Sequence, residues 1–194
     1  MATQQAAATT TSVLDRPTAI YEIDPTHTIA EFSVKHMMFT TVKGRFGTVS
    51  GEIAFDADDP THSSVVATAE VASIDTHEPQ RDAHLRSPDF FDAEHYPVLR
   101  IESRRVEPTG RDSEYRVIAD LTIRGVTREV VFEASYLGTG TDPWGGRRIG
   151  ISAAATINRK DFGLHWNMAL EAGGVLVGDV VKINLEIEAV RREV

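Results

Sequence analysis

Apolar and polar residues alternate along most of this chain, which is the pattern of β-strands with one buried face. In the clearest run, residues 180–190, five apolar side chains fall on one face and charged or amide side chains fall on the other. The alternation predicts eight or nine strands, which cover residues 19–24, 27–36, 44–56, 65–74, 98–106, 114–125, 128–138, 147–158 and 180–190. We therefore expect a protein of the all-β class.

Short connections join most of the predicted strands. Turn signals such as Asp24-Pro25 and Arg124-Gly125 stand between them, whereas a parallel crossover would need about a dozen residues or more. The one long connection, residues 77–95, contains Pro79 and Ser87-Pro88-Asp89, both of which can begin a helix. The sequence therefore predicts antiparallel strands, with one or two short helices in this connection.

The predicted strands are long and carry one polar face each, which favours an extended antiparallel barrel of eight strands. Closure of the barrel removes the edges that long strands would otherwise expose. An eight-stranded barrel can either fill its interior with side chains or hold one small ligand. Small residues on the inward face favour an open lumen, and they are Ala67, Ala69, Ala119, Ala134, Ala153 and Ala155.

The strand predicted over residues 27–36 ends in an unusual way. Phe32, Val34 and His36 share its inward face, so two apolar side chains would line the lumen and the imidazole would lie near its end. The residues that follow, Met37–Phe39, would form an adaptable apolar rim at a ligand entrance. The alternative is that the same residues close the barrel as a hydrophobic plug.

The composition narrows the classes of function. The chain has 194 residues and a net charge of −9, so phosphate groups of nucleic acids or anionic membranes would repel it. It contains no cysteine, which excludes disulfides, thiolate nucleophiles and cysteine-ligated zinc. Residues 1–18 are small and polar, so we expect a disordered tail. No secretory signal or apolar run of membrane-spanning length is evident, which predicts a cytoplasmic protein.

Four blocks of sequence resemble the YceI-like family. The family's opening, with Ile-Asp, Phe-x-Val-x-His and Gly-x-Phe, is matched by YEIDPTHTIAEFSVKHMMFTTVKGRF (residues 21–46). Its central signature is matched by RDAHLRSPDFFDAEHYPVLRIES (81–103), and its Leu-Thr-x-x-Gly-x-Thr hairpin by DLTIRGVTREVVF (120–132). Its C-terminal segment resembles INRKDFGLHWNMALEAGGVLVGDVVKINLEIEA (157–189).

The resemblance implies a single YceI-like domain over residues 19–194, with a lipocalin-like barrel around a deep apolar channel. It implies a non-catalytic carrier of a long-chain amphiphile, which would be a polyisoprenoid quinone, a fatty acid or a fatty amide. No cofactor is expected, and exposed apolar loop residues would favour a homodimer. The predicted ligand positions are Phe32, Val34, His36, Met38, Phe39, Ala67, Ala69, Leu99, Ile101, Ala119, Leu121, Phe132, Ala134, Ile151, Ala153, Trp166 and Leu185.

The polar residues leave an alternative open. His36, His84 or Arg159 could serve a small enzyme or stress-response factor that acts on an isoprenoid or acyl lipid. Ser87 does not stand in a G-x-S-x-G elbow, and nothing in the sequence places a nucleophile beside a general base. The histidines include no HExxH pair, so the sequence predicts neither a catalytic site nor a metal site.

Overall fold

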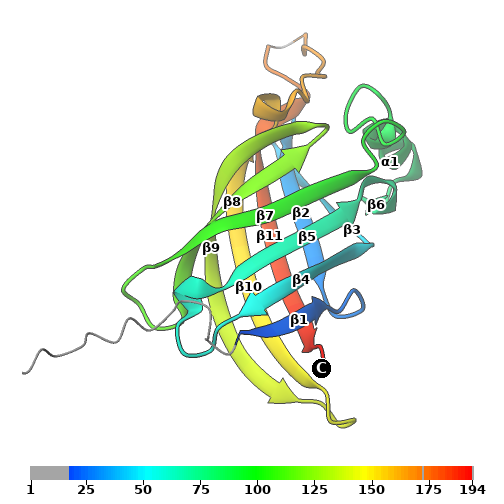
Figure 1. The fold of residues 1–194 in the computed structure, drawn as a ribbon. Helices are drawn as coiled ribbons and strands as arrows, with labels where there is room; N and C mark the ends of the chain where they lie inside the picture. Colours follow the sequence, from blue (N-terminus) through cyan, green and yellow to red (C-terminus); the bar gives the residue numbers. More distant parts are fainter. Residues whose placement is uncertain (1–17, 172, 194) are drawn as a thin grey trace, which may run out of the picture.

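The computed structural model describes residues 18–171 and 173–193, and its elements are mostly β-strands (Figure 1). The predicted tail, residues 1–18, lies outside this range apart from Thr18. The strands are β1 (Ala19–Ile23), β2 (Ile29–His36), β3 (Thr40–Phe46), β4 (Val49–Phe55), β5 (Ser64–Glu70), β6 (Ile74–Asp75), β7 (Val98–Pro108), β8 (Glu114–Ile123), β9 (Val126–Thr141), β10 (Arg147–Asn158) and β11 (Val177–Arg191). The helices are α1 (Pro79–Arg86) and the 3₁₀ turns η1 (Pro60–His62), η2 (Val71–Ser73) and η3 (Arg159–Phe162).

Eight of these strands form a closed antiparallel barrel, which confirms the predicted fold class. Their order is β1-β4-β5-β7-β8-β9-β10-β11, and the pairing of β1 with β11 closes the ring. Strand β11 is 15 residues long and serves two neighbours on one edge. It pairs with β2 as far as Glu186 and with β1 from Ala189 onward. Strands β2, β3 and β6 therefore form a branch that leaves the barrel at β11 (Figure 1).

Thr28 bridges the fork where β11 changes partner. Its hydroxyl donates to the Glu188 carbonyl oxygen at 3.2 Å and accepts from the Glu188 N–H at 3.3 Å. The Asp24 N–H donates to the same carbonyl oxygen at 2.9 Å. Because partly buried backbone groups need hydrogen-bond partners, these contacts substitute for the strand that is missing at the fork.

The sequence predicts one strand over residues 44–56, but this prediction is wrong because the chain turns between β3 and β4. The Gly47 N–H donates to the Ser73 carbonyl oxygen at 3.1 Å, and the Thr48 N–H donates to Ser73 Oγ at 3.0 Å. These bonds hold the turn against η2. Phe46 and Val49 both face the interior, and their odd spacing is the signal of a break in the alternation.

Two β-bulges change which side chains face inward. Arg104 is the extra residue on β7, because Ser103 and Arg105 oppose consecutive residues of β8, and Val106 consequently lines the interior. Leu137 is the extra residue on β9, opposite the step between Gly150 and Ile151 of β10. Its side chain is 66% exposed.

Helix α1 is the single α-helix among the described residues, within the connection for which one or two helices are predicted. The Glu78 side chain caps it by accepting from the N–H groups of Gln80 and Arg81 at 3.1 and 2.6 Å. The buried Asp82 carboxylate accepts from the N–H and the hydroxyl of Thr76 at 2.9 and 2.6 Å. These bonds fix α1 beside β6 at one side of the barrel (Figure 1).

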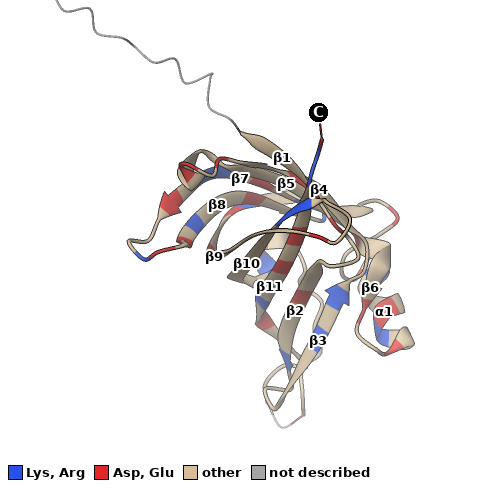
Figure 2. Cartoon of the chain, turned by 90° about the horizontal axis from the view of Figure 1, so that it is seen from below, with Lys and Arg blue, Asp and Glu red and all other residues tan. Residues whose placement is uncertain are grey.

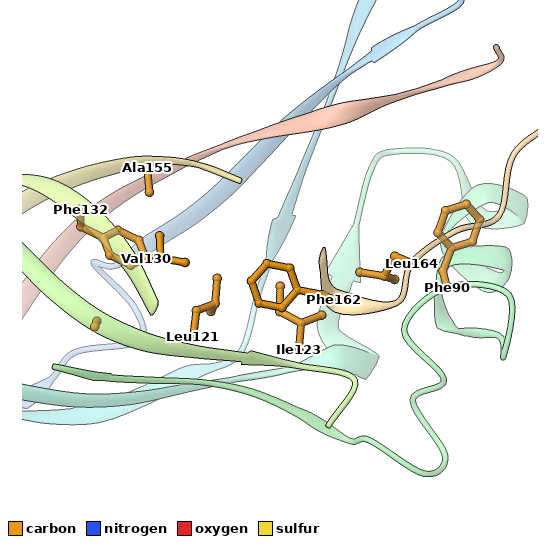
Figure 3. Close-up of a cluster of buried hydrophobic side chains, with 9 residues drawn as sticks. Phe90, Leu121, Ile123, Val130, Phe132, Ala155, Phe162 and Leu164 are labelled. Atoms are coloured by element: carbon orange, nitrogen blue, oxygen red, sulfur yellow. The ribbon is translucent and has the colours of Figure 1, made fainter. Parts of the chain in front are cut away.

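Buried apolar side chains form two separate clusters. The first combines Phe162 and Leu164 with inward side chains of β8 and β9, and Phe90 lies beside Leu164 at one end of this row (Figure 3). The second surrounds Tyr21 and Phe55, where β1 pairs with β4. The interior is therefore packed in parts and not along its whole length.

Arg148 joins three carboxylates from different segments. Its Nη1 donates to Asp24 Oδ2 at 2.7 Å and to Glu188 Oε1 at 2.5 Å, and its Nε donates to Asp142 Oδ2 at 2.8 Å. Asp24 follows β1, Asp142 lies in the turn between β9 and β10, and Glu188 belongs to β11. The guanidinium group thus ties together the elements near the closure of the barrel.

We predict that Arg148→Gln lowers the free energy of unfolding near neutral pH by about 1–3 kcal/mol, because three carboxylates lose a hydrogen-bonded cation. Hydrogen bonds from Thr26, Arg148 and His27 hold the pKa of Asp24 well below its usual range. Stability from such a depressed pKa is present above the unfolded value of about 3.9 and is lost as the pH falls. Urea unfolding should therefore show the difference between wild type and variant narrowing on acidification.

Arg192→Gln is the matched control. The Arg192 guanidinium contacts Glu22 and Glu52, but its side chain is 45% exposed, so its loss should lower the free energy of unfolding less than the loss of Arg148 does. The prediction for Arg148 would be contradicted if both variants lost the same free energy of unfolding. It would also be contradicted if the difference between wild type and Arg148→Gln did not change with pH.

Candidate functional site: an apolar channel

The barrel contains two adjoining cavities of about 180 Å³ and about 120 Å³. Both contact Ala67, Ile101, Leu185 and Ile187, so they are consecutive parts of one interior space, called here the channel. A water molecule needs only about 10–15 Å³ by the same kind of measure. The structure therefore has the open lumen that the small inward residues predict.

The first cavity is lined by inward side chains of β2, β5, β7, β8 and β11. Its lining is apolar except for Thr28, Thr68, Glu31 and Arg159. Small residues such as Ala69 keep the space open, because each alanine fills little of the volume that a leucine would occupy. This part of the channel therefore has a polarity that matches an apolar chain.

The second cavity is lined by β4, β5, β7, β8, β9, β10 and β11 and reaches the η1 turn. None of its lining residues carries a formal charge. Its polar side chains are all hydroxyls, which come from Ser63, Ser64, Tyr115, Ser135 and Tyr136. Both parts of the channel therefore have an almost wholly apolar surface, and serine and tyrosine residues are among those that line the second part.

Most of the predicted ligand positions line the channel, as strand parity indicates. Contact with a ligand stays a prediction for all of them. Those in the first cavity are Phe32, Val34, Ala67, Ala69, Leu99, Ile101, Leu121 and Leu185. Those in the second cavity are Ala67, Ile101, Phe132, Ala134, Ile151, Ala153 and Leu185.

The predicted rim residues lie outside the channel lining. Met38 and Phe39 are 63% and 80% exposed, because Met37 and Met38 take φ angles of 50° and 63° and turn the chain into solvent. His36 ends β2, and its carbonyl oxygen accepts from the Phe39 N–H at 3.0 Å. Met38 and Phe39 therefore do not close the barrel as a plug.

Ala119 and Trp166 are the other predicted ligand positions that do not line the channel. Ala119 is fully buried within the first apolar cluster. The Trp166 ring contacts the rings of His84 and Phe90, with centroids 4.6 and 5.2 Å apart. Ala119 therefore belongs to the packed part of the interior, and Trp166 packs behind Phe90, which lines the first cavity.

The predicted ligand positions do not include Leu85, Phe90 and Phe91, which cover the first cavity from the α1 side, although the sequence predicts that the Phe90-Phe91 pair packs the connection onto the barrel. Phe91 packs edge-on against Phe46, with ring centroids 5.9 Å apart, and Phe46 packs against Phe32 at 5.7 Å. The consecutive phenylalanines in an otherwise polar connection are the available signal, because such a pair is usually buried.

Arg159 lines the first cavity, but its hydrogen bonds go to the protein. The residue is 4% exposed, and its guanidinium group donates to the carbonyl oxygens of Gly178, Leu164 and Trp166 at 2.9, 2.6 and 2.9 Å. Burial lowers the pKa of Arg159, and the nearby Asp179 carboxylate opposes this effect. Arg159 therefore fixes the segment after η3 against the start of β11 and offers little to an incoming anion.

The remaining charged group of the lining is also paired, because Glu31 accepts from Lys43 Nζ at 2.9 Å. His84 Nε2 lies 2.9 Å from Asp89 Oδ2, outside the channel lining. Within the described residues, the lining thus combines paired charges, neutral hydroxyls and apolar groups.

Among the described residues, one set has the spacing of metal ligands, namely Asp24, His27 and Glu188. Their ligand atoms lie within 4.8 Å of one another. Arg148 already donates to both carboxylates, so a cation at this point would have to displace the guanidinium group. The set therefore acts as part of the ionic link described above.

None of the helices in the described part of the chain combines the length and the apolar character needed to cross a membrane.

Gly44 leaves room for a ring that lines the first cavity. It pairs with Phe32 across β2 and β3, and a Cβ atom on Gly44 would stand 2.4 Å from Phe32 Cζ. We predict that Gly44→Ala lowers the free energy of unfolding by about 1–3 kcal/mol, because the ring must move into the cavity. Urea unfolding of a double-mutant cycle with Phe32→Leu measures this coupling. An equal cost of the alanine in both backgrounds would show that the ring is not the obstacle.

Comparisons with known proteins agree with this architecture. The family model of the YceI-like domain matches residues 21–189. A UPF0312 protein of Pseudomonas paraeruginosa is 35% identical over 90% of this chain and 88% of its own length. The solved structure of the Campylobacter jejuni YCEI protein is 28% identical and covers 82% of this chain and 90% of its own, with a TM-score of 0.67.

A polyisoprenoid binding domain from Saccharophagus degradans has the same fold. Its structure covers 90% of this chain and 99% of its own, with 16% identity and a TM-score of 0.65. The matched family model extends over nearly the whole barrel, from β1 to β11. This chain therefore belongs to the YceI-like family.

Proposed function

We propose that the protein is a non-catalytic carrier that holds one long-chain amphiphile in the channel. The observation that carries this proposal is the hollow, largely apolar interior, whose two cavities meet at Ala67, Ile101, Leu185 and Ile187. The apolar tail would occupy the first cavity, and the head group would lie near the serine and tyrosine residues that line the second cavity. The fold shared with a polyisoprenoid binding domain supports an isoprenoid or similar chain as the tail.

The driving force for binding is the removal of the tail from water. Burial of one methylene group contributes about 0.8 kcal/mol, so a dozen buried methylenes would contribute roughly 10 kcal/mol before the costs of association. A channel without free charges gains this energy with little desolvation penalty of its own. The tail would therefore supply most of the affinity, and the head group would supply selectivity.

The polar groups of the channel favour an uncharged head group. Arg159 and Glu31, the charged residues of the lining, are engaged by backbone carbonyl oxygens and by Lys43 respectively. A buried carboxylate without a cationic partner would lose its hydration without compensation. Hydroxyls such as those of Tyr115 and Tyr136 can donate to a carbonyl oxygen of a quinone or an amide. The proposed ligand is thus a polyisoprenoid quinone or a fatty amide, and a fatty acid is expected to bind less tightly.

The residues named for an enzymatic alternative are not brought together. His84 lies outside the channel lining and contacts Asp89, His36 ends β2, and Arg159 is bonded to backbone carbonyl oxygens. In the described residues of the lining, no nucleophile stands beside a general base. A binding function accounts for this arrangement better than a catalytic one. Residence in the cytoplasm and assembly as a homodimer stay predictions from the sequence.

We predict that the purified protein retains a neutral long-chain lipid. Native mass spectrometry should show a bound mass that organic extraction releases, and the emptied protein should take up a polyisoprenoid quinone or a fatty amide more tightly than the fatty acid of equal length. The incubated lipids should be recovered chemically unchanged. A protein that is always empty and binds none of these lipids would contradict the carrier function, and consistent turnover would favour the enzyme.

Two consecutive alanines of β10 provide a matched test of the channel. Ala153 faces the second cavity, whereas Ala154 is exposed on the outer face of the same strand. We predict that Ala153→Trp weakens binding of a fluorescent long-chain lipid by about tenfold or more, because the indole fills space that the ligand needs. Ala154→Trp should leave the affinity nearly unchanged.

Circular dichroism should show β-structure in both variants, so that the comparison reports on the channel and not on folding. Equal affinities for Ala153→Trp and Ala154→Trp would place the ligand outside the second cavity.

A further inference from the structure

Four exposed apolar side chains gather at one end of the molecule. Met38 and Phe39, in the turn between β2 and β3, are 63% and 80% exposed, and Met168 and Val175, in the segment before β11, are 56% and 38% exposed. These four residues are called here the apolar tip. Figure 1 shows the segment before β11 extending beyond the barrel, at the end opposite the turn between β9 and β10.

Backbone hydrogen bonds hold the two parts of the apolar tip together. The Met37 N–H donates to the Leu176 carbonyl oxygen at 2.8 Å, and the Leu176 N–H donates to the Met168 carbonyl oxygen at 3.0 Å. The Asn167 side chain adds a bond from its Nδ2 to the Val177 carbonyl oxygen at 2.7 Å. The apolar tip is therefore a single structure built from two loops.

The turn that carries Met38 and Phe39 has an unfavourable backbone. Met37 and Met38 have φ angles of 50° and 63°, and the Phe39 N–H closes the turn on the His36 carbonyl oxygen at 3.0 Å. Asn and Gly are the residues that normally occupy two consecutive left-handed positions in a hairpin. Methionine at both positions costs conformational energy and places an apolar side chain in solvent, and such strain is typical of functional segments.

The base of the apolar tip adjoins the first cavity. Val34 and Val177 line that cavity, and they lie close in sequence to the β2–β3 turn and to the segment before β11. Val177 is paired with His36, the residue that precedes the turn. A tail in the first cavity therefore ends next to the apolar tip, while the hydroxyls of the second cavity lie farther along the channel.

The two loops of the apolar tip carry few charged residues, although the chain carries a net charge of −9. Figure 2 shows the turn between β2 and β3 almost entirely in the colour of uncharged residues. Glu171 is the acidic residue of the neighbouring segment, and Lys160 pairs with Asp179 at 2.8 Å. Lys35 is exposed and has no carboxylate partner among the described residues, so its ammonium group can contact a phosphate. This arrangement suits a zwitterionic lipid surface.

We propose that the apolar tip docks on the surface of a phospholipid bilayer and inserts Met38 and Phe39 between the lipids. An amphiphile could then enter the channel head group first and leave its tail nearest the bilayer, without crossing water. Methionine and aromatic side chains suit this contact, because they bury large apolar areas and adapt their shape. This inference rests on the proposed carrier function and names the surface with which the carrier exchanges its ligand.

The test compares vesicle binding of the wild type with that of a tip variant, Met37→Asn/Met38→Gly/Phe39→Ser. Asn and Gly suit the left-handed positions, so the variant should unfold at the same or a higher temperature than the wild type. In flotation with phosphatidylcholine vesicles, its binding should fall by about tenfold or more, as expected for the loss of large apolar side chains. Trp144→Ser is the control, since Trp144 is 87% exposed in the turn between β9 and β10 and should leave binding unchanged.

A second measurement separates docking from ligand binding. Both the wild type and the tip variant should take up a fluorescent lipid from cyclodextrin, where no bilayer is present. A wild type that takes up this lipid but never floats with vesicles would overturn the docking proposal and leave the carrier function standing. A wild type that takes up no lipid from either source would overturn the carrier function as well.

Two further outcomes would overturn docking. One is a tip variant that floats as well as the wild type. The other is a wild type that forms a dimer on size exclusion and does not float, together with a tip variant that is monomeric, because the apolar tip would then be an interface between two copies of this chain.

Discussion

The architecture depends on a wall whose backbone hydrogen bonds are satisfied within the wall itself. Strand β11 makes this possible, because one edge of it pairs with β10 and the other is shared by β2 and β1. A closed ring has no free edge, so its strands stay in register without a fully packed centre. Residues such as Ala153 can then remain small, and the space that they leave becomes the channel.

A hollow interior has an energetic cost, because the side chains around it lack contacts that a packed core would provide. Packing beside the channel offsets part of this cost. Phe162 and Leu164 pack with inward residues of β8 and β9, and Tyr21 and Phe55 anchor the second cluster. In the proposed carrier, an apolar tail would supply the contacts that the channel lacks, so some stability of the empty protein would be exchanged for affinity.

The sequence predicts the barrel and most of the channel lining, because side chains of a strand alternate with a fixed period of two. This period places Leu121, Ala134 and Leu185 in the channel. It fails where the backbone departs from regular geometry, as at the bulge residue Leu137. The Met37-Met38 turn could not be predicted, since methionine does not indicate a left-handed backbone. Phe90 and Phe91 cover the first cavity because the long connection folds back over it, and the alternation of strand residues does not describe how a connection folds.

Thr28 compensates for the gap in strand pairing at the fork where β11 changes partner. Its hydroxyl contacts both backbone groups of Glu188 at the fork, and the same residue faces the first cavity. Valine has the same shape but could not make either bond, so the Glu188 amide would need water as its partner, while the carbonyl would keep the Asp24 N–H. Water that enters at this fork would hydrate the lining and weaken the preference of the proposed apolar tail for the channel. The hydroxyl oxygen of Thr28 thus helps to keep the tunnel dry.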